Sequence, residues 1–202
     1  MALLALDWSS PRLSLAVASG SATLEITRFQ GPDAIGFLEQ FLQEHALSAA
    51  ELEEVRVGVG PGNFSGIRLS IAWALGLAAP GGVRLQGVSS LGLMSARLLA
   101  AGEDSFAILG DARRGMWWGS VTREGRAGSL MLRAPEAWQR EIEGLPRYSP
   151  EPQRLLSGGV EAVWLTPLAE TALHPQTEFC DLAPVYLHGA VDEKMDKPPS
   201  TA

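Results

Sequence analysis

The chain has 202 residues, of which 46% are hydrophobic and 19% are charged, and its formal net charge is −7. This composition suits one or two compact lobes with a sizeable core and excludes a disordered or fibrous chain. The acidic balance argues against binding nucleic acid through bulk charge, because that requires clustered Lys and Arg. Any contact with RNA is therefore expected to be local or made through a partner protein.

The chain contains one cysteine, Cys180, and three histidines. One cysteine cannot form an intramolecular disulfide, and so few ligands disfavour a Cys/His zinc cluster. The longest apolar run, 67–79, includes Arg68 and falls short of the ~20 residues of a transmembrane helix. The first residues lack the basic segment of a signal peptide. We therefore expect a cytoplasmic protein with no membrane span.

In the first half of the chain, the spacing of apolar residues predicts strands interleaved with helices. Strands are expected where apolar residues run together or alternate, at 3–6, 13–17, 22–29, 55–59 and 83–88. Helices are expected where apolar residues recur every three or four positions, at 33–47, 65–79 and 90–101. The first strand ends at Asp7, and a tight turn leads from it into the second strand.

The second half of the chain opens on the same plan. A strand at 106–110 ends at Asp111, and a short turn leads to a strand at 116–121. This repetition at half-chain separation predicts two related lobes. The expected division is 1–101, 102–191 and a frayed tail at 192–202. Further elements are expected as strands at 130–133 and 154–157, a short helix after Pro135, and a helix around 160–173 that Pro167 interrupts.

The most distinctive motif joins a strand to a helix and reads Gly60-Pro61-Gly62-Asn-Phe64-Ser65-Gly66-Ile-Arg68. Its small residues let backbone N–H groups face an anion or a close-packed neighbour. The motif lacks the Gly-Lys-Ser/Thr ending of a P-loop. Ser65 is not the centre of a Gly-x-Ser-x-Gly nucleophile elbow. The pattern alone leaves open a structural turn and a phosphate-binding loop.

The full motif resembles that of the bacterial tRNA threonylcarbamoyladenosine biosynthesis family TsaB (YeaZ), usually Gly-Pro-Gly-Ser-Phe-Thr-Gly-Leu-Arg. Further stretches are similar in the same order: Leu4-Ala-Leu-Asp7-Trp-Ser-Ser with Leu13-Ser-Leu-Ala-Val17, Gly87-Val-Ser-Ser90-Leu and Asp111-Ala-Arg113-Arg-Gly. Later in the chain, only Pro184-Val-Tyr186-Leu is similar to the family ending. The chain departs from the family pattern at Trp8, Met116 and His188, where a small hydroxyl residue, glutamate and arginine are usual.

The resemblance implies an actin-like, RNase H-like (ASKHA) α/β fold of two related lobes, each with a mixed sheet and flanking helices. In active ATPases of this class, an aspartate at the first turn of each lobe helps to hold magnesium and phosphates. Asp7 and Asp111 occupy the corresponding positions. The resemblance implies a vestigial nucleotide or metal cleft there, with no catalytic residue, metal or cofactor. The alternative is a stand-alone ATPase or small-molecule kinase that uses both aspartates.

The helices expected at 33–47 and 65–79 carry more apolar residues than one sheet contact requires. Either the adjacent lobe or a partner protein covers the excess. The resemblance favours a partner, because in the TsaB family these helices pack against their counterparts in TsaD. The expected contact residues are Ile35, Leu38, Phe41, Leu42, Ile67, Ile71 and Trp73. Replacing both Leu38 and Ile71 by aspartate is expected to abolish association and leave a folded chain.

The implied function is that of a non-catalytic subunit of the complex that forms threonylcarbamoyladenosine at position 37 of tRNA. The protein would dock with and activate the transferase TsaD, with the ATPase TsaE as third member. It would meet tRNA only through the complex and pair with itself in isolation. The chain is not TsaD itself, because no two histidines have the His-x-x-x-His spacing. One basic cluster, Arg113, Arg114, Arg123 and Arg126, is either a solvated edge or a contact to the tRNA backbone or to an acidic loop of a partner.

Overall fold

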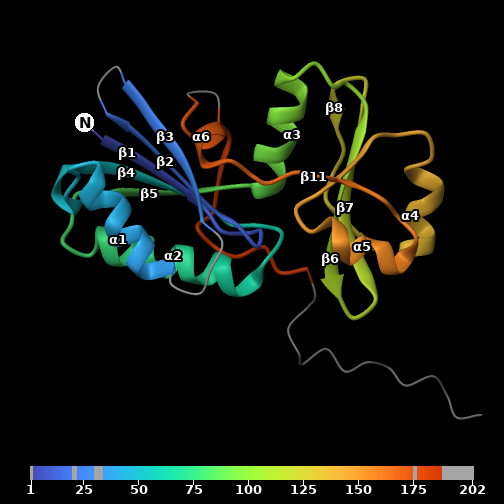
Figure 1. Ribbon diagram of the computed structural model, residues 1–202, viewed down its shortest axis with the longest axis horizontal. Helices are drawn as coiled ribbons and strands as arrows, with labels where there is room; N and C mark the ends of the chain where they lie inside the picture. Colours follow the sequence, from blue (N-terminus) through green and yellow to red (C-terminus); the bar gives the residue numbers. More distant parts are fainter. Residues whose placement is uncertain (1, 20–21, 30–33, 175–176, 188–202) are drawn as a thin grey trace, which may run out of the picture.

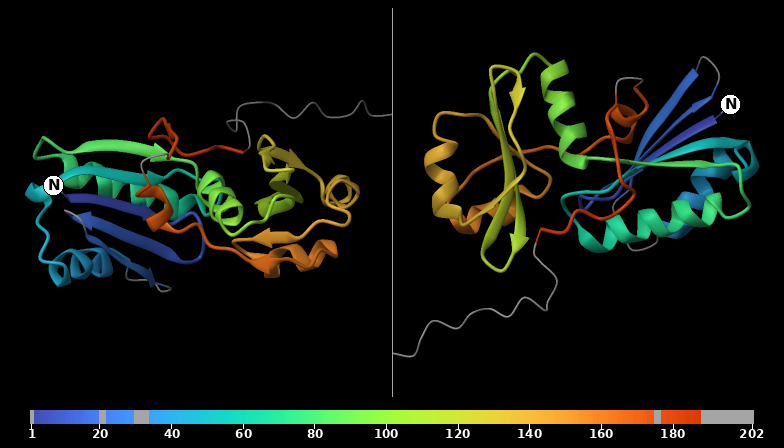
Figure 2. Two further views of the ribbon diagram at one scale, coloured as in Figure 1. Left: turned by 90° about the horizontal axis from the view of Figure 1, so that it is seen from above. Right: turned by 180° about the vertical axis from the view of Figure 1, so that it is seen from behind.

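The computed structural model describes the backbone of residues 2–19, 22–29, 34–174 and 177–187, and the side chains of 22–35 are outside that description. Two mixed β-sheets, each with its own helices, form two lobes that lie side by side (Figure 1). The view from above shows α3 and the C-terminal segment between the two lobes (Figure 2). The predicted α/β fold of two lobes is confirmed.

The first sheet has six strands in the order β12-β5-β4-β1-β2-β3. Strands β1, β2 and β3 are antiparallel neighbours, whereas β4 and β5 extend the sheet from β1 in parallel. The bounds are β1 Ala2–Asp7, β2 Leu13–Ser19, β3 Ala22–Phe29, β4 Leu52–Gly58, β5 Arg84–Val88 and β12 Phe179–Cys180. The tight turn after Asp7 sets the β1–β2 register and places Asp7 opposite Ser14.

Helices cover both faces of the first sheet. The two on one face are α1 (Ala34–Glu44) and α2 (Phe64–Ala78), and a short 3₁₀ turn, Ala49–Glu51, follows α1. The two on the other face are α3 (Ser90–Ala100) and α6 (Ala169–Ala172). Apolar side chains of β1 and β4 form the main core with α1 and α2, because these strands are buried on both faces.

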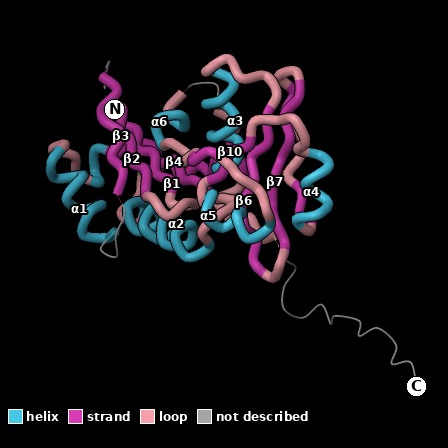
Figure 3. The backbone as a smooth tube through the Cα atoms, turned by 45° about the vertical axis from the view of Figure 1, so that its right-hand side comes forward, coloured by secondary structure: helices cyan, strands magenta, loops and turns pink. Residues whose placement is uncertain are grey.

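The second sheet repeats the strand order of the first on a smaller scale, β11-β10-β6-β7-β8, with β9 also paired to β7. Its first strand is antiparallel to the next and parallel to β10. The strand bounds are β6 Phe106–Arg113, β7 Met116–Arg123, β8 Arg126–Ala127, β9 Met131–Arg133, β10 Arg147–Ser149 and β11 Val163–Trp164. The helices α4 (Pro135–Glu141) and α5 (Pro152–Leu155), with the 3₁₀ turn Leu156–Gly158, cover its outer face (Figure 3).

Helix α3 joins the two lobes. Its Leu93 packs into the small core above the first sheet, whereas Leu91, Met94 and Leu98 pack on the second sheet with Phe106. One helix therefore serves as the inner layer of both lobes, and the interface between them is apolar.

The chain returns to the first lobe near its C-terminal end. Arg56 of β4 donates hydrogen bonds from Nη1 to the carbonyl oxygens of Ala172 (2.5 Å) and His174 (3.2 Å). Both α6 and β12 thus lie on the first sheet, although the sequence assigned 102–191 to the second lobe. The predicted tail, 192–202, lies outside the described residues.

Two predicted elements are wrong. Residues 154–157 belong to α5 and a 3₁₀ turn instead of a strand, because Pro152 begins a helical turn and Gly159, at φ 72°, ends it. The helix predicted at 160–173 is interrupted before Pro167, as expected, but only the four-residue α6 after it is helical, because the part before it forms the short strand β11. Among the described residues, no helix is long and apolar enough to cross a membrane.

Candidate functional site

The glycine-rich motif wraps around the turn that follows Asp7. The backbone N–H of Asn63 donates to the carbonyl oxygen of Ser9 at 2.6 Å. A Cβ atom on Gly62 would collide with the Ser9 carbonyl, and one on Gly66 would collide with the Trp8 carbonyl. Gly62 also has a φ of 150°, which side chains rarely adopt. These two glycines therefore allow two backbone segments to pack directly on each other.

The same loop is hydrogen-bonded to the start of α3. Gly60 N–H donates to Ser90 Oγ at 3.0 Å, and Ser90 N–H donates to the Gly60 carbonyl at 2.9 Å. Asn63 caps α2 by accepting a hydrogen bond from Gly66 N–H. The backbone groups of Gly60 are thus used inside the protein. This arrangement favours the structural-turn interpretation of the motif over a phosphate-binding loop.

Asp7 lies at the centre of this packing, where it is 1% exposed. Its Oδ1 atom accepts hydrogen bonds from Ser9 N–H (2.8 Å) and Ser9 Oγ (2.7 Å), which close the turn. Its Oδ2 atom has no partner among the described residues and faces Gly58. Burial raises the pKa of the Asp7 carboxyl, and the hydroxyl groups of Ser9 and Ser90, with the Ser9 N–H, lower that pKa by less. The carboxyl is thus enclosed by the protein and has no open side toward solvent from which a cation could be bound.

Asp111 occupies the equivalent position of the second lobe in a different environment. Its Oδ1 accepts from Arg113 N–H at 2.8 Å, and its Oδ2 pairs with Arg113 Nη1 (3.1 Å) and Arg154 Nη1 (3.4 Å). Arg154 also pairs through its Nε with Glu151 Oε2 at 2.7 Å. Arginines thus balance this carboxylate. No group of three His, Cys, Asp or Glu side chains that could hold a metal occurs in the described part of the chain.

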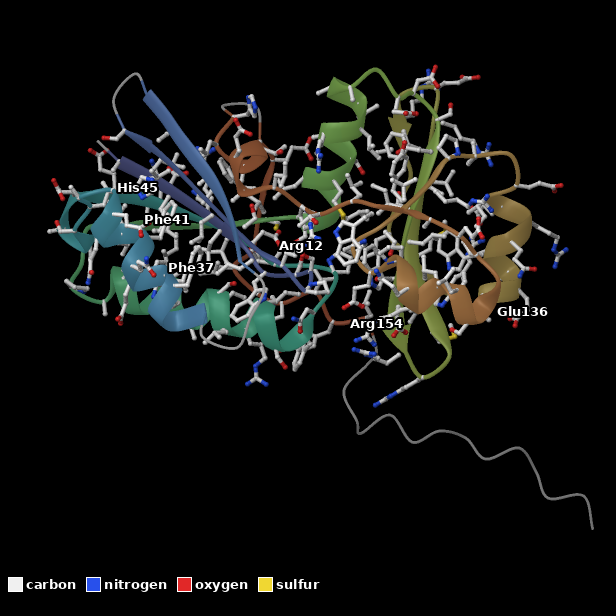
Figure 4. All side chains as sticks on the ribbon, in the orientation of Figure 1. Arg12, Phe37, Phe41, His45, Glu136 and Arg154 are labelled. Atoms are coloured by element: carbon white, nitrogen blue, oxygen red, sulfur yellow. The ribbon has the colours of Figure 1, made fainter. Side chains whose placement is uncertain are left out.

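The structure corrects part of the predicted contact surface. Leu38, Phe41 and Ile67 are each 1% exposed and belong to the core of the first lobe, so a partner cannot reach them. Ile71 is buried with them at 9% exposure. The reason is that α1 and α2 both turn their most apolar side toward the sheet. Phe37 and Phe41 pack inward, and His45 continues their row along α1 (Figure 4).

Two of the other predicted contact residues are compatible with a surface role, and a third lies outside the described side chains. Leu42 and Trp73 are half-buried and pack against the same core from its edge. The side chain of Ile35 lies outside the described residues.

The accessible side of α2 carries the apolar surface that sequence reasoning missed. Leu75 is 52% exposed, and Ala72, Gly76 and Ala79 are exposed beside it. Nothing lies within 4 Å of the position that a Cβ of Gly76 would occupy. A glycine inside a helix costs roughly 1 kcal/mol of stability relative to alanine. Because a side chain would fit at Gly76, packing within the chain does not explain the glycine. In the sequence, this exposed surface could have been predicted from Gly76 and from the near absence of polar residues on α2.

An aromatic cluster stands at the start of α2. The rings of Phe64 and Tyr186 have centroids 5.7 Å apart, and the Arg68 guanidinium lies 5.2 Å from the centroid of Phe64. All three side chains are exposed. Of the predicted motif residues, Phe64, Ser65 and Arg68 are therefore at the surface, whereas Gly60, Pro61 and Gly66 are buried.

Direct contacts tie the two lobes together near the Asp7 turn. The guanidinium of Arg12 stacks over the ring of Trp164 at 4.8 Å, so a first-lobe side chain meets a second-lobe strand (Figure 4). Trp164 Nε1 donates to Thr166 Oγ1 at 2.8 Å, and Arg97 of α3 donates to the Thr166 carbonyl. Such contacts hold the lobes in one arrangement.

The predicted basic cluster is divided by the structure. Arg113 and Arg114 form the tip of the β6–β7 hairpin, whereas Arg123 and Arg126 pair across the turn at the other end of β7. A cavity of about 380 Å³ lies beside α4 and β10, lined in part by Gln139, Arg140 and Arg147. None of the predicted site residues lines it.

The duplicated strand order, with an aspartate turn opening each sheet, defines an α/β fold of two lobes, the actin-like (ASKHA-type) fold. The family model described as TsaD, tRNA N6-adenosine threonylcarbamoyltransferase, matches residues 33–125. This match includes α1, α2, α3 and the glycine-rich motif. No curated protein matches the chain significantly in sequence.

Two solved structures share the fold over almost their whole length. YeaZ from Pseudomonas aeruginosa has a TM-score of 0.65 at 21% identity, and the match covers 92% of this chain and 99% of that one. The second is described as an uncharacterized protein with similarity to peptidase YEAZ from Pseudomonas aeruginosa. It has a TM-score of 0.69 at 22% identity over 93% and 99% of the two chains. The resemblance stated from the sequence is confirmed at the level of the fold, which is YeaZ-like.

Proposed function

We propose that the chain is a non-catalytic subunit of the machinery that makes threonylcarbamoyladenosine in tRNA, and that it docks with and activates the transferase TsaD through the accessible side of α2. The observation that carries the proposal is the exposed apolar side of α2 within the segment that matches the TsaD family model. The ATPase TsaE and tRNA would join the assembly through that complex.

The shape of α2 supports a helical partner. Ala72, Leu75, Gly76 and Ala79 lie three to four residues apart, so they share one side of the helix. Small side chains there let a second helix approach closely, and Leu75 adds apolar area at the centre. We refer to these four residues as the docking face. Association would cover apolar surface that water now contacts, which is favourable.

The state of the two aspartates supports the non-catalytic part of the proposal. An ATPase of this class needs two accessible carboxylates that face magnesium and phosphates. Here the Asp7 carboxyl is buried in the turn, and the Asp111 carboxylate is paired with two arginines. The alternative of a stand-alone ATPase or kinase has no specific observation in its favour.

The decisive test is size-exclusion chromatography with light scattering, using the chain alone and mixed with TsaD of the same organism. The wild-type chain should form a stable heteromer with TsaD. Gly76→Arg should abolish the heteromer, since it places a charged side chain in the middle of the docking face. It should not unfold the helix, because the site is open and arginine is the better helix former.

Two control variants separate docking from folding. Gly76→Ala should keep the heteromer, because a methyl group is small enough for close approach. Gln139→Arg places the same charge on an exposed site of α4, far from α2 in sequence and in the other lobe, and should also keep it. A wild-type chain that does not associate with TsaD, or a Gly76→Arg chain that associates normally, would overturn the proposal.

A further inference from the structure

The segment that precedes the C-terminal end of the described chain crosses from one lobe to the other. Leu182 and Val185 pack against the core of the first lobe, whereas Leu187 packs against the apolar cluster of the second. Val185 N–H donates to the carbonyl oxygen of Val59 at 2.9 Å, directly before the glycine-rich motif. Residues 182–187, which we call the strap, are thus held at both ends.

Tyr186 sits between these anchors and points away from both cores. It is 65% exposed, the largest exposed fraction among the large hydrophobic side chains of the described residues. Val185 and Leu187 on either side of it pack on the two cores, whereas the Tyr186 side chain is turned to solvent. Its ring leans on Phe64, which is itself 45% exposed. The strap therefore presents an aromatic ring to solvent at a fixed position.

Arg68 completes this surface with an available positive charge. Its guanidinium is stacked on Phe64, and no carboxylate lies within ion-pairing distance of it among the described residues. Exposed tyrosine and arginine are the residue types that contribute most to protein–protein binding energy. Because contacts within the chain already order these side chains, little conformational entropy would be lost on binding.

We propose that Phe64, Arg68 and Tyr186 form an anchor cluster that extends the docking face to the strap, and that it receives an apolar side chain and a neighbouring carboxylate of TsaD. The inference rests on the proposed function, since it identifies the energetic centre of the same interface. Arg68 lies one helical turn before Ala72, so the cluster and the docking face are continuous along α2.

The charge of the cluster favours TsaD over a second copy of the chain as its occupant. A twofold pairing centred on the cluster would bring two Arg68 side chains together and join two chains of net charge −7. An acidic group on a different protein avoids that repulsion and supplies Arg68 with hydrogen-bond acceptors.

The test is isothermal titration calorimetry, in which TsaD is titrated with the wild-type chain or with single variants at low and at high salt. Tyr186→Ala should weaken binding by about tenfold or more, as expected for a hot-spot residue. Tyr186→Phe should keep most of the affinity, because it retains the ring. Arg68→Gln should weaken binding and flatten its salt dependence. Val163→Ala, at an exposed apolar site of the second lobe, is the matched control and should bind normally.

The outcomes distinguish this inference from the proposed function. If Gly76→Arg abolishes binding while Tyr186→Ala and Arg68→Gln bind as the wild type does, the docking face stands and the anchor cluster is overturned. If Tyr186→Ala weakens only self-association, a second copy is the occupant and the inference also fails. If the wild-type chain does not bind TsaD, the proposed function itself fails. Circular dichroism and urea unfolding of each variant identify any loss of folding.

Discussion

The two lobes share one strand order but differ in the length of their helices. After the three antiparallel strands, the first lobe builds helices of 11 and 15 residues, α1 and α2, whereas the second lobe builds helices of 7 and 4 residues, α4 and α5. The long α2 leaves one side exposed after its inner side has packed on the sheet. The comparison shows that the first lobe leaves apolar helix surface exposed, whereas α3 is shared between the cores of both lobes.

The equivalent aspartates show a second difference between the lobes. Asp7 is sealed under the glycine-rich motif and lacks a partner for Oδ2, whereas Asp111 is partly accessible and paired with arginines. The same strand–aspartate–turn arrangement thus produces a buried carboxyl group in one lobe and an arginine-paired, partly accessible one in the other. A shared topology determines where a residue lies, but its neighbours determine its burial and its partners.

The largest expected effect separates the core side of the first-lobe helices from their accessible side. Leu38→Asp should unfold the chain or cost several kcal/mol, roughly 3 or more, because it buries a charge without a partner. Leu75→Asp should leave the free energy of unfolding within about 0.5 kcal/mol, as for most exposed positions. Urea unfolding followed by circular dichroism measures both. A folded, stable Leu38→Asp chain would contradict the assignment of the core.

This expectation replaces the one drawn from sequence. A chain with Leu38 and Ile71 both changed to aspartate would lose partner binding simply because it does not fold. Leu75→Asp and Gly76→Arg are the variants that test the interface without that ambiguity.

An intermediate effect concerns Asp7. Its pKa is raised in the folded state, so the folded chain binds the proton more tightly than the unfolded chain does. Ionisation therefore costs stability as pH rises from the unfolded pKa, roughly 4, through the raised folded pKa. Asp7→Asn should remove this loss, so the stability of the variant should fall less than that of the wild type as pH rises. The measurement is the urea midpoint against pH. Identical pH profiles for the two chains would show that Asp7 is not a buried acid.

The smallest effect is expected at two hairpin turns of the second lobe. Arg114 and Glu124 precede Gly115 and Gly125 and have φ values of 54° and 50°. Both turns match the type in which asparagine before glycine is preferred, because asparagine tolerates positive φ. Arg114→Asn and Glu124→Asn should each stabilise the chain by about 0.5 kcal/mol, read as a small rise in thermal midpoint. Destabilisation by either variant would show that its side chain makes a needed contact.

Much of the fold could be predicted from the sequence, because apolar spacing and breakers are local signals. The strands at 22–29 and 116–121 and the helix at 90–101 were found from them. The prediction was wrong at 154–157 and 160–173, where elements are only two to four residues long and packing decides their type. The return of β12 to the first sheet had no local signal, since Phe179 and Cys180 pair with β5, about 90 residues earlier in the chain.

The candidate site was predicted less well for the same reason. Sequence pattern identified α2 and the glycine-rich motif, but it chose the most apolar residues of the helix, which the sheet buries. Leu75, Gly76 and Tyr186 were missed, because exposure depends on what other segments cover.

The sequence by itself determined the order of strands and helices, the aspartate turn in each lobe and the glycines at 60–66, since these depend on residues close together in the chain. Only the tertiary structure decided which side of α2 is free, that Asp7 is a buried acid and Asp111 a paired carboxylate, and that the strap turns Tyr186 outward beside Phe64. Each of these depends on burial by segments distant in sequence, and burial sets both the cost of a charge and the accessibility of an apolar surface.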